Sequence, residues 1–512
     1  MLKPLDDVLS FLITIGSPAL ALYSLQITRL NGRWIADGFS YVDYPGAKRI
    51  PAVLSAFHHV PVRISHDPPL HSLSVLHEKN KFWDRLEVAA NKTRRWSIPL
   101  GMNFVLVIFA AILTVLDSLF SPRPGDIGYG IAATWTFLLP LVIGWLRVGC
   151  EPEPNHLKNS LTAANEEAWA ATAQRGDPAQ NSVIEFMKPD DVGPAGKDEL
   201  KPVPLFNYSR AFVWASSAER ALKLAKAAPI PKQDIPVGNP TGRGPLTSVE
   251  DEKRTISNEN RVGGSTEVTQ HTTSNESRIG TDAEVIDYPR DRPRALLGLS
   301  PTNPLTTAPS DETRSTDPLI SDDLPAISQN QSRWATGIWE RVAISAALAL
   351  GLQWGTVGAA VLIHYLAPPA GLGCRAFSFM LYGVTGTISF LFFLASSILA
   401  HMSRPRQEWE QGYEDKSSRA RGFQETGAII CRRAGKCIAI LSAIGIMLVC
   451  FFQITGAFNN CFCTSTTFDK GRGSVVFLSI NYIIGSNILR IWIGGLIMAV
   501  STAVLFGISI YL

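Results

Sequence analysis

Seven long apolar stretches decide what this chain can fold into. A helix needs roughly 20 predominantly apolar residues to cross a bilayer, and uncharged runs of that length are rare in soluble proteins. The stretches, which carry one charged residue between them, are Val8–Ile27, Ile98–Phe120, Tyr129–Leu146, Val342–Leu366, Ala376–Ala400, Cys437–Phe458 and Ile491–Leu512. The sequence therefore predicts an all-α, polytopic membrane protein with about seven transmembrane helices.

The basic residues predict the orientation of these helices. If the N-terminus lies outside, the outer segments hold only six of the 47 Lys and Arg residues: Lys3, Arg123, Arg375, Lys470, Arg472 and Arg490. Lys and Arg collect on the cytosolic side of membrane proteins. We therefore expect an outside or lumenal N-terminus and a cytosolic C-terminus, in the plasma membrane or another membrane of the secretory pathway.

Two segments each have a second interpretation that would change the number of spans. The first stretch also has the layout of a cleaved signal, with Ala19-Leu20-Ala21 as a small-residue cleavage site. Asp6 and Asp7 before the apolar run, and the basic segment 28–97 after it, favour a retained anchor. Ser474–Leu489 is apolar but too short to span, so we expect a re-entrant or interfacial segment there.

The basic segment 28–97 holds five of the nine histidines: His58, His59, His66, His71 and His77. Its prolines argue against regular structure, except for a helix within Leu73–Ala90. A metal site is one interpretation of the histidines, but their spacing matches no zinc pattern. We favour a solvated loop that faces the lipid headgroups, and we predict no metal.

The long loop that follows the third stretch has two parts. Residues 156–172 and 207–228 have helical patterning. In the second segment an apolar stripe recurs at helical spacing between bases, formed by Tyr208, Ala211, Phe212, Ala215, Ala218, Leu222 and Ala225. This helix either lies on the inner leaflet or docks on the cytosolic face of the protein itself, and the sequence favours neither.

Residues 229–333 are rich in Pro, Ser, Thr, Asn and charged residues. Such a composition buries too little apolar surface to offset the entropy of ordering, so we expect a disordered linker with many sites for phosphorylation. Cytosolic protein partners are expected to bind within 147–333. The chain thus divides into residues 1–27, 28–97, 98–146, 147–228, 229–333 and 334–512.

The cysteines sort by side of the membrane. Cys374, Cys461 and Cys463 fall on the outer side, where disulfides persist, and a bond from Cys374 to either of the other two would tie two outer loops together. Cys150, Cys431 and Cys437 are cytosolic and next to the membrane, as free thiols or palmitoylation sites. Four N-glycosylation triplets, at Asn91, Asn207, Asn275 and Asn330, are predicted to be cytosolic and unused.

Polar residues inside membrane spans are costly and mark candidate functional sites. The candidates are Asn103, Asp117, Gln353, His364 and Gln453. They either form a polar pathway between the spans or make interhelical hydrogen bonds, and we favour the second interpretation. A GxxxG pair at Gly351 and Gly355 predicts a face where another helix approaches closely.

Local signatures of enzymes are missing from the sequence. Gly435-Lys436 lacks the upstream glycine and the following Ser or Thr of a phosphate-binding loop, and His77-Glu78 is not followed by the second histidine of a zinc protease motif. A net charge of +3 excludes a strongly basic nucleic-acid binder. We therefore predict no catalytic residues, no cofactor and no nucleic-acid partner.

Several short motifs resemble a family of uncharacterised fungal multi-span membrane proteins. They are Ile15–Leu25, Asn31–Trp34, Leu352–Thr356, Gly371–Arg375, Asn460–Cys463 and Trp492–Gly495. The resemblance implies a shared group of outer residues, Cys374, Arg375, Cys461 and Cys463. It implies no particular activity. Two functions remain: a membrane sensor or scaffold with a regulatory cytosolic loop, or a small-solute transporter or channel that uses the polar residues between the spans.

Overall fold

The computed structural model describes fifteen segments of the chain: residues 3–42, 48–59, 62–64, 80–90, 129–148, 159–164, 184–186, 196–201, 203–227, 333–367, 371–404, 418–460, 462–463, 467–469 and 488–511. Within them the chain is helical apart from two short antiparallel strands, β1 (Val62–Ile64) and β2 (Ile184–Phe186). The predicted span Ile98–Phe120, the linker up to residue 332 and residues 474–487 lie outside the described residues.

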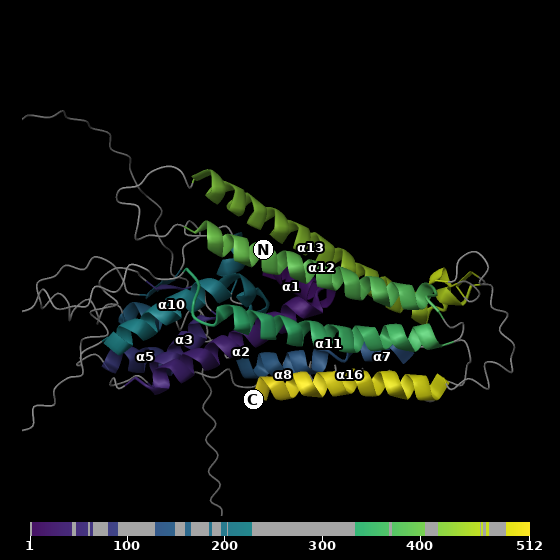
Figure 1. Ribbon diagram of the computed structural model, residues 1–512, viewed down its shortest axis with the longest axis horizontal. Helices are drawn as coiled ribbons and strands as arrows, with labels where there is room; N and C mark the ends of the chain where they lie inside the picture. The colour runs from purple at the N-terminus through teal and green to yellow at the C-terminus, as the bar shows by residue number, and fades with distance from the viewer. Residues whose placement is uncertain are drawn as a thin grey trace, which may run out of the picture. The chain divides into compact units, whose positions relative to one another are not determined.

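Within the described residues, four helices are long and apolar enough to cross a membrane. They are α11 (Ile338–Leu366), α12 (Cys374–Ser403), α13 (Ser418–Ile454) and α16 (Ile488–Tyr511), and they run alongside one another (Figure 1). Large apolar side chains such as Leu441 on α13 and Leu505 on α16 are exposed, as expected of surfaces that face lipid. The described chain is thus a helical protein with four candidate spans, compatible with a multi-pass membrane protein.

Helices α12 and α13 pack as an antiparallel pair whose register is fixed by hydrogen bonds. Ser389 Oγ donates to the Gly435 carbonyl at 2.9 Å, and Ser396 Oγ donates to the Ala428 carbonyl at 2.7 Å. The first bond sets the turn of α13 that carries Gly435 against the middle of α12. The first half of α13, which precedes the uncharged stretch beginning at Cys437, therefore lies along α12.

Helix α2 (Pro18–Ser40) is the centre of the core. Every residue from Pro18 to Thr28 is buried. The helix packs against α11, α10 (Asn207–Ala227), α3 (Ile50–Phe57) and α8 (Leu138–Val148). Since neighbouring helices cover this segment on all sides, it contributes a protein-facing core rather than a lipid-facing surface.

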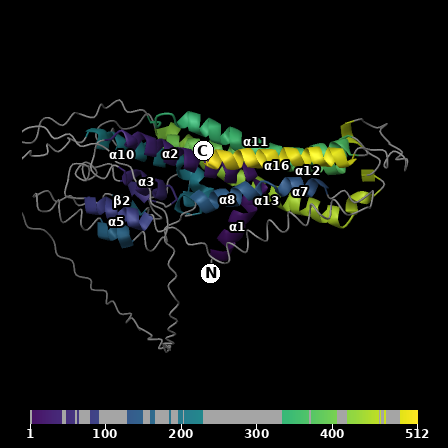
Figure 2. The same ribbon diagram turned by 90° about the horizontal axis from the view of Figure 1, so that it is seen from below.

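The predicted span Val8–Ile27 is not one continuous helix. Helix α1 (Lys3–Gly16) and α2 meet at Ser17 with a bend of 98° (Figure 2). A proline disfavours the helical conformation in the residue before it, and Ser17 has φ −138° and ψ 74°. Gly16 also permits the close approach of α13, because a Cβ here would lie 1.7 Å from the Ala439 carbonyl oxygen.

The predicted span Tyr129–Leu146 is also interrupted, between α7 (Tyr129–Trp135) and α8. A turn at Thr136 and Phe137 places Pro140 in the first helical turn of α8, where its missing N–H costs nothing. The GxxxG prediction holds for one glycine: Gly355 lies against Thr502 of α16, whereas nothing lies within 4 Å of a Cβ at Gly351.

The prediction that the proline-rich part of 28–97 lacks regular structure is wrong for residues 50–57. These residues form α3, with Pro51 in its first turn, where a proline removes no helical hydrogen bond. Helix α3 packs on α2 and on α5 (Asn80–Ala90), which lies within the predicted helix 73–90. Arg49 pairs with Asp84 and Glu87 of α5.

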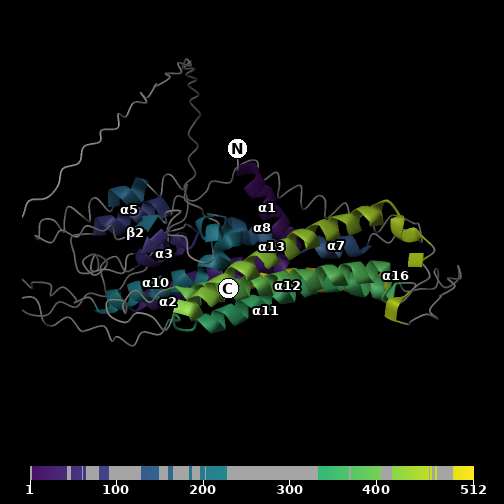
Figure 3. The same ribbon diagram turned by 90° about the horizontal axis from the view of Figure 1, so that it is seen from above.

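Helix α10 docks on the protein's own helices, which resolves the two placements left open above. All seven residues of its apolar stripe are buried, and it packs against α2 and α12 (Figure 3). The short helices η3 (Gly196–Leu200) and η4 (Pro204–Phe206) lead into it. Ser24 of α2 donates to the Leu205 carbonyl at 2.8 Å, which ties this entry to the core helix.

Candidate functional site

Polar side chains, most of them buried, gather where η3 and α10 meet α11, the end of α12 and the middle of α13. This buried polar cluster consists of Thr28, Asn31, His58, His59, Asp198, Glu199, Asn207, Tyr208, Arg210, Arg341, Arg404 and Lys436. Its members come from α2, the end of α3, η3, α10, α11, the end of α12 and α13. Here ion pairs and hydrogen bonds join segments that are far apart in the sequence.

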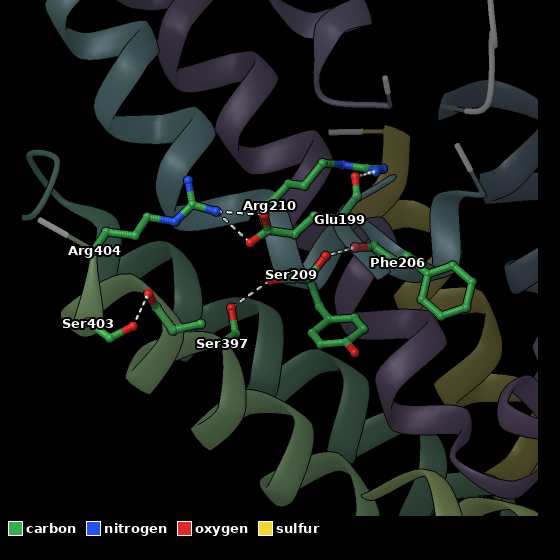
Figure 4. Close-up of polar contacts among 9 residues, drawn as sticks. Glu199, Phe206, Ser209, Arg210, Ser397, Ser403 and Arg404 are labelled. Atoms are coloured by element: carbon green, nitrogen blue, oxygen red, sulfur yellow. Dashed lines mark hydrogen bonds and ion pairs between the residues drawn. The ribbon is translucent and has the colours of Figure 1, made fainter. Parts of the chain in front are cut away.

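Two adjacent carboxylates of η3 hold the cluster to α12 and α13. Asp198 and Glu199 are each only 1 % exposed. Lys436 Nζ lies 2.6 Å from Asp198 Oδ1, and Arg404 reaches both carboxylate oxygens of Glu199 at 2.6 Å (Figure 4). Tyr208 donates its hydroxyl to Asp198 at 3.2 Å, and burial beside this carboxylate raises the pKa of Tyr208.

Arg210 of α10 is buried and orders the backbone that leads into its own helix. It donates to the carbonyls of Glu199 at 2.8 Å and Lys201 at 2.7 Å, and to Asn207 Oδ1 at 2.6 Å. Figure 4 shows Arg210 and Arg404 on either side of Glu199. Ser397 links α12 to α10 by donating to the Tyr208 carbonyl at 2.7 Å.

His58 and His59 are buried, so the prediction of a solvated loop is wrong for these two histidines. His58 lies 3.4 Å from Thr28 Oγ1 through Nδ1 and 3.4 Å from Asn31 Nδ2 through Nε2. His59 Nδ1 is 3.0 Å from Asn207 Nδ2. These side chains enclose the rings because α3, which the proline pattern hid, carries them against α2 and α10.

Burial makes both histidines neutral. Desolvation and the positive charge of Arg210 lower the pKa of His59 to about 4. Burial, the neighbouring His59 and the same arginine lower the pKa of His58 well below its usual value. His66, His71 and His77 lie outside the described residues, and the described ones contain no group of three or more metal-ligating side chains. In this environment the pair acts as hydrogen-bonding core histidines.

Arg341 connects α11 to α2. Its Nε donates to Asn31 Oδ1 at 2.8 Å, and one terminal nitrogen donates to the Thr336 carbonyl at 3.0 Å. The guanidinium also lies 4.2 Å from the centre of the Trp34 ring. This arginine therefore fixes the start of α11 on the buried half of the cluster.

The chain that enters α11 is anchored on α10. Glu219 accepts hydrogen bonds from the Thr336 hydroxyl at 2.6 Å and from the Thr336 amide at 3.1 Å. Phe212, Trp334, Trp339 and His401 pack together beside this contact, with Trp334 and His401 ring centres 4.7 Å apart. Residue 227 ends α10 and residue 333 precedes α11, so the predicted linker 229–333 begins and ends beside the two helices joined here.

Of the predicted polar residues within the spans, the three that the structure describes, Gln353, His364 and Gln453, do not belong to the buried polar cluster. Gln353 is 1 % exposed and its amide bonds to protein groups at both ends: Oε1 accepts from the Ala19 amide at 3.0 Å, and Nε2 donates to the Gly383 carbonyl at 2.9 Å and to Thr387 at 3.0 Å. It thus packs between helices and caps the start of α2, the interpretation favoured from the sequence.

The structure describes two of the other span candidates, His364 and Gln453. His364 is buried and stacks on Phe379 with ring centres 5.2 Å apart. Gln453 is also buried, near the end of α13. Asn103 and Asp117 lie outside the described residues. None of the hydrogen bonds of Gln353 described above is made with His364 or Gln453.

The cysteines at the opposite end of the helices are joined. Cys374 forms a disulfide with Cys463, with the two Cα atoms 5.4 Å apart, and this selects one of the two predicted pairings. Asp469 supports the same loops by accepting from the Leu372 amide at 3.0 Å. Cys431 and Cys437 are free thiols, half-buried and exposed respectively, while Cys150 and Cys461 lie outside the described residues.

Sequence reasoning missed the two carboxylates because they lie outside the apolar stretches. Glu199 is 205 residues from Arg404, and Asp198 is 238 residues from Lys436. The only local signal was an adjacent acidic pair close to the amphipathic helix 207–228. The two acids come from the loop before α10, and each pairs with a base of α12 or α13 that is distant in the sequence.

Comparison with known proteins adds no relative to this picture. No family model, no curated protein and no solved structure matches the chain. The arguments about function therefore rest on the geometry of the buried polar cluster and of the helices around it.

Proposed function

We propose that this chain is a non-enzymatic membrane sensor or scaffold whose cytosolic loop is regulatory. One observation carries the proposal: loop residues 196–227 are joined to the middle of α13 through Asp198–Lys436 and to the end of α12 through Glu199–Arg404. Buried ion pairs of this kind are costly to leave half-formed. A movement of either long helix must therefore be accompanied by a rearrangement of the loop.

The proposal includes the topology predicted from the sequence: seven spans, an outside or lumenal N-terminus and a cytosolic C-terminus. Support comes from the two ends of the bundle. The Cys374–Cys463 disulfide favours an oxidising compartment at one end, and Arg341 and Arg404 lie towards the other. Asn207 is 1 % exposed and hydrogen-bonded, which fits its proposed lack of glycosylation.

Cytosolic proteins that bind within residues 147–333 are the proposed partners, beside the lipid bilayer itself. The fungal multi-span family remains a prediction from the sequence motifs. Cys437 is the better of the two described candidates for palmitoylation, because its thiol is exposed and it begins an uncharged stretch.

Transport of a small solute is the second candidate, and the broken helix favours it. Interrupted helices form the substrate sites of many transporters, where the freed end of a half-helix contacts the substrate. Here the freed Ala19 amide is bonded to Gln353 and the Ile15 carbonyl accepts from the Tyr382 hydroxyl at 2.6 Å. Because the chain's own side chains occupy the break, we place transport second.

The two candidates differ in the access of water to Gln353. In a variant without free thiols, single cysteines at positions 353 and 453 would be labelled with a water-soluble reagent, and positions 3, 60, 300 and 470 would report topology. The sensor or scaffold proposal expects protection at 353 and labelling of 60 and 300 only after permeabilisation. Labelling at 353 in the folded protein would favour transport.

A positive test measures coupling between the two ends. The double variant Cys374→Ser, Cys463→Ser loosens the outer loops without touching the buried polar cluster. The proposal expects faster amide exchange in residues 196–227 of this variant. Cys431→Ser is the control, because Cys431 is a free thiol that takes part neither in the disulfide nor in the buried polar cluster. Unchanged exchange in 196–227 would refute a sensing role.

A further inference from the structure

Three phenylalanines form an exposed patch at the disulfide end of the bundle. Phe377, Phe462 and Phe468 are 40 %, 58 % and 49 % exposed. The ring centres of Phe377 and Phe468 are 5.5 Å apart, and those of Phe462 and Phe468 are 6.4 Å apart. These three residues are called the aromatic patch below. Large apolar side chains that gather on a surface mark a contact with another protein or with a membrane.

The two loop residues of the aromatic patch are fixed to the start of α12. Phe462 precedes Cys463, and the disulfide joins Cys463 to Cys374, the first residue of α12. The Phe468 amide donates to the Leu372 carbonyl at 2.9 Å. The patch therefore belongs to the folded bundle and keeps its place at the end of α12.

The aromatic patch lies at the level where two candidate spans end. Asp469, the neighbour of Phe468, accepts from the hydroxyl of Tyr365 at 3.4 Å, and Tyr365 is the penultimate residue of α11. Phe377 lies in the first turn of α12. Tyrosine collects at the boundary of a membrane, because its ring favours lipid and its hydroxyl favours water. A bilayer that α11 and α12 cross therefore has one of its surfaces at the height of the patch.

The aromatic patch also continues an exposed apolar face of α12. Large exposed side chains recur along this helix at spacings of three and four, which places them on one face: Phe377, Leu381, Val384, Ile388 and Leu391. On a helix long and apolar enough to span a membrane, such a face is expected to contact lipid. Phe377 belongs to both surfaces, so the lipid that covers this face of α12 is also the nearest occupant for Phe468 and Phe462.

We propose that the aromatic patch inserts into the bilayer, with Phe462 and Phe468 among the acyl chains next to the headgroups and Asp469 at the headgroup level. Each of the two rings still exposes about half of its surface, and burial of that surface favours the inserted state by about fivefold for each ring. The disulfide and the Phe468–Leu372 hydrogen bond connect this lipid contact directly to α12. The inference goes beyond the proposed function, because a sensor and a transporter could both use such a contact.

The test introduces p-benzoylphenylalanine at single positions of the full chain in phosphatidylcholine nanodiscs. Irradiation bonds this residue to a C–H group within reach, and mass spectrometry distinguishes an acyl chain from protein as the product. Positions 462 and 468 test the patch. Leu441, on the exposed face of α13, is the positive control, and the exposed Tyr41, beyond the last residue of α2, is the negative control.

Lipid adducts are expected at positions 462, 468 and 441. The yields at 462 and 468 should exceed the yield at 41 by at least about fivefold, in line with the preference of each ring for the inserted state. Electrophoresis without reductant checks that the Cys374–Cys463 disulfide forms in every variant. A variant that fails to fold is thereby separated from one whose patch does not contact lipid.

Two results would overturn the inference. One is a yield of lipid adducts at 462 and 468 no higher than at 41, in variants that keep the disulfide. The other is a cross-link from these positions to another segment of the chain or to a second copy in place of lipid, since protein would then cover the patch. Neither result bears on water access at position 353 or on amide exchange in residues 196–227, so the proposed function is judged separately.

Discussion

Replacement of Gln353 by methionine tests how the break between α1 and α2 is held. Methionine keeps the volume of the side chain and removes the acceptor of the Ala19 amide. The two partners of Gln353 Nε2 keep other bonds, because Thr387 Oγ1 donates to the Gly383 carbonyl at 2.8 Å and accepts from Trp354 at 3.1 Å. The Ala19 amide is therefore the group left buried without a partner.

The expected loss of stability follows from that single group. A buried donor without a partner costs about 2 kcal/mol, which lowers the folding equilibrium constant about thirtyfold. Thr356→Val is the matched control on the same helix, because Thr356 is fully buried and its hydroxyl donates only within α11, to the carbonyls of Leu352 and Gln353. This control should cost less than about 1 kcal/mol.

Reversible unfolding of the full chain in mixed micelles, followed by circular dichroism, measures both variants. Gln353→Met should lose clearly more stability than Thr356→Val. Equal losses would refute the reasoning, because some other group would then satisfy the Ala19 amide. Water is the obvious substitute, and its presence at the break would strengthen the case for transport.

Three further predictions concern the two ends of the bundle. The pKa of His59 falls from 6.5 in the unfolded chain to about 4 in the folded chain. The free energy of unfolding should therefore be constant above pH 6.5 and fall by about 3 kcal/mol as the pH drops to 4, with His58 adding in the same direction. In unfolding measured across that pH range, the variant His59→Gln should show a flatter dependence on pH. Arg210→Met should cost about 3 kcal/mol or more in chemical unfolding, since it leaves Asn207 and two carbonyls without their donor, whereas a loss below 1 kcal/mol would contradict the role given to the guanidinium. Cys374→Ser should cost about 4 kcal/mol, as expected for a disulfide that closes 89 residues, and a reductant should destabilise the unmodified chain equally but leave the variant unaffected.

The long spans could be predicted from the sequence because hydropathy is a local property. Val342–Leu366 lies within α11, and Ala376–Ala400 lies within α12. The stripe of α10 was likewise visible, since helical spacing between Tyr208 and Ala225 needs no knowledge of distant residues. Its neighbours were not visible, so the sequence left two placements for the helix.

The break at Ser17 and the carboxylates of η3 depend on contacts between distant segments. A proline within a span is tolerated or bends it according to what else bonds the freed backbone, and here Gln353 and Tyr382 lie more than 330 residues away. Asp198 and Glu199 resemble ordinary loop residues until Lys436 and Arg404 are placed beside them. Periodicity carries no information about such pairs.

The contact between Glu219 and Thr336 has a consequence for how this chain varies in length. The backbone leaves α10 and re-enters α11 from elements that are already fastened together, so the span between the two exits is fixed by the bundle. Doubling the number of residues between them adds only about 0.6 kcal/mol of closure entropy. For the disordered linker that the sequence predicts in this interval, insertions, deletions and whole added modules would change the free energy of folding little, and the chain would have room there to acquire new sequence.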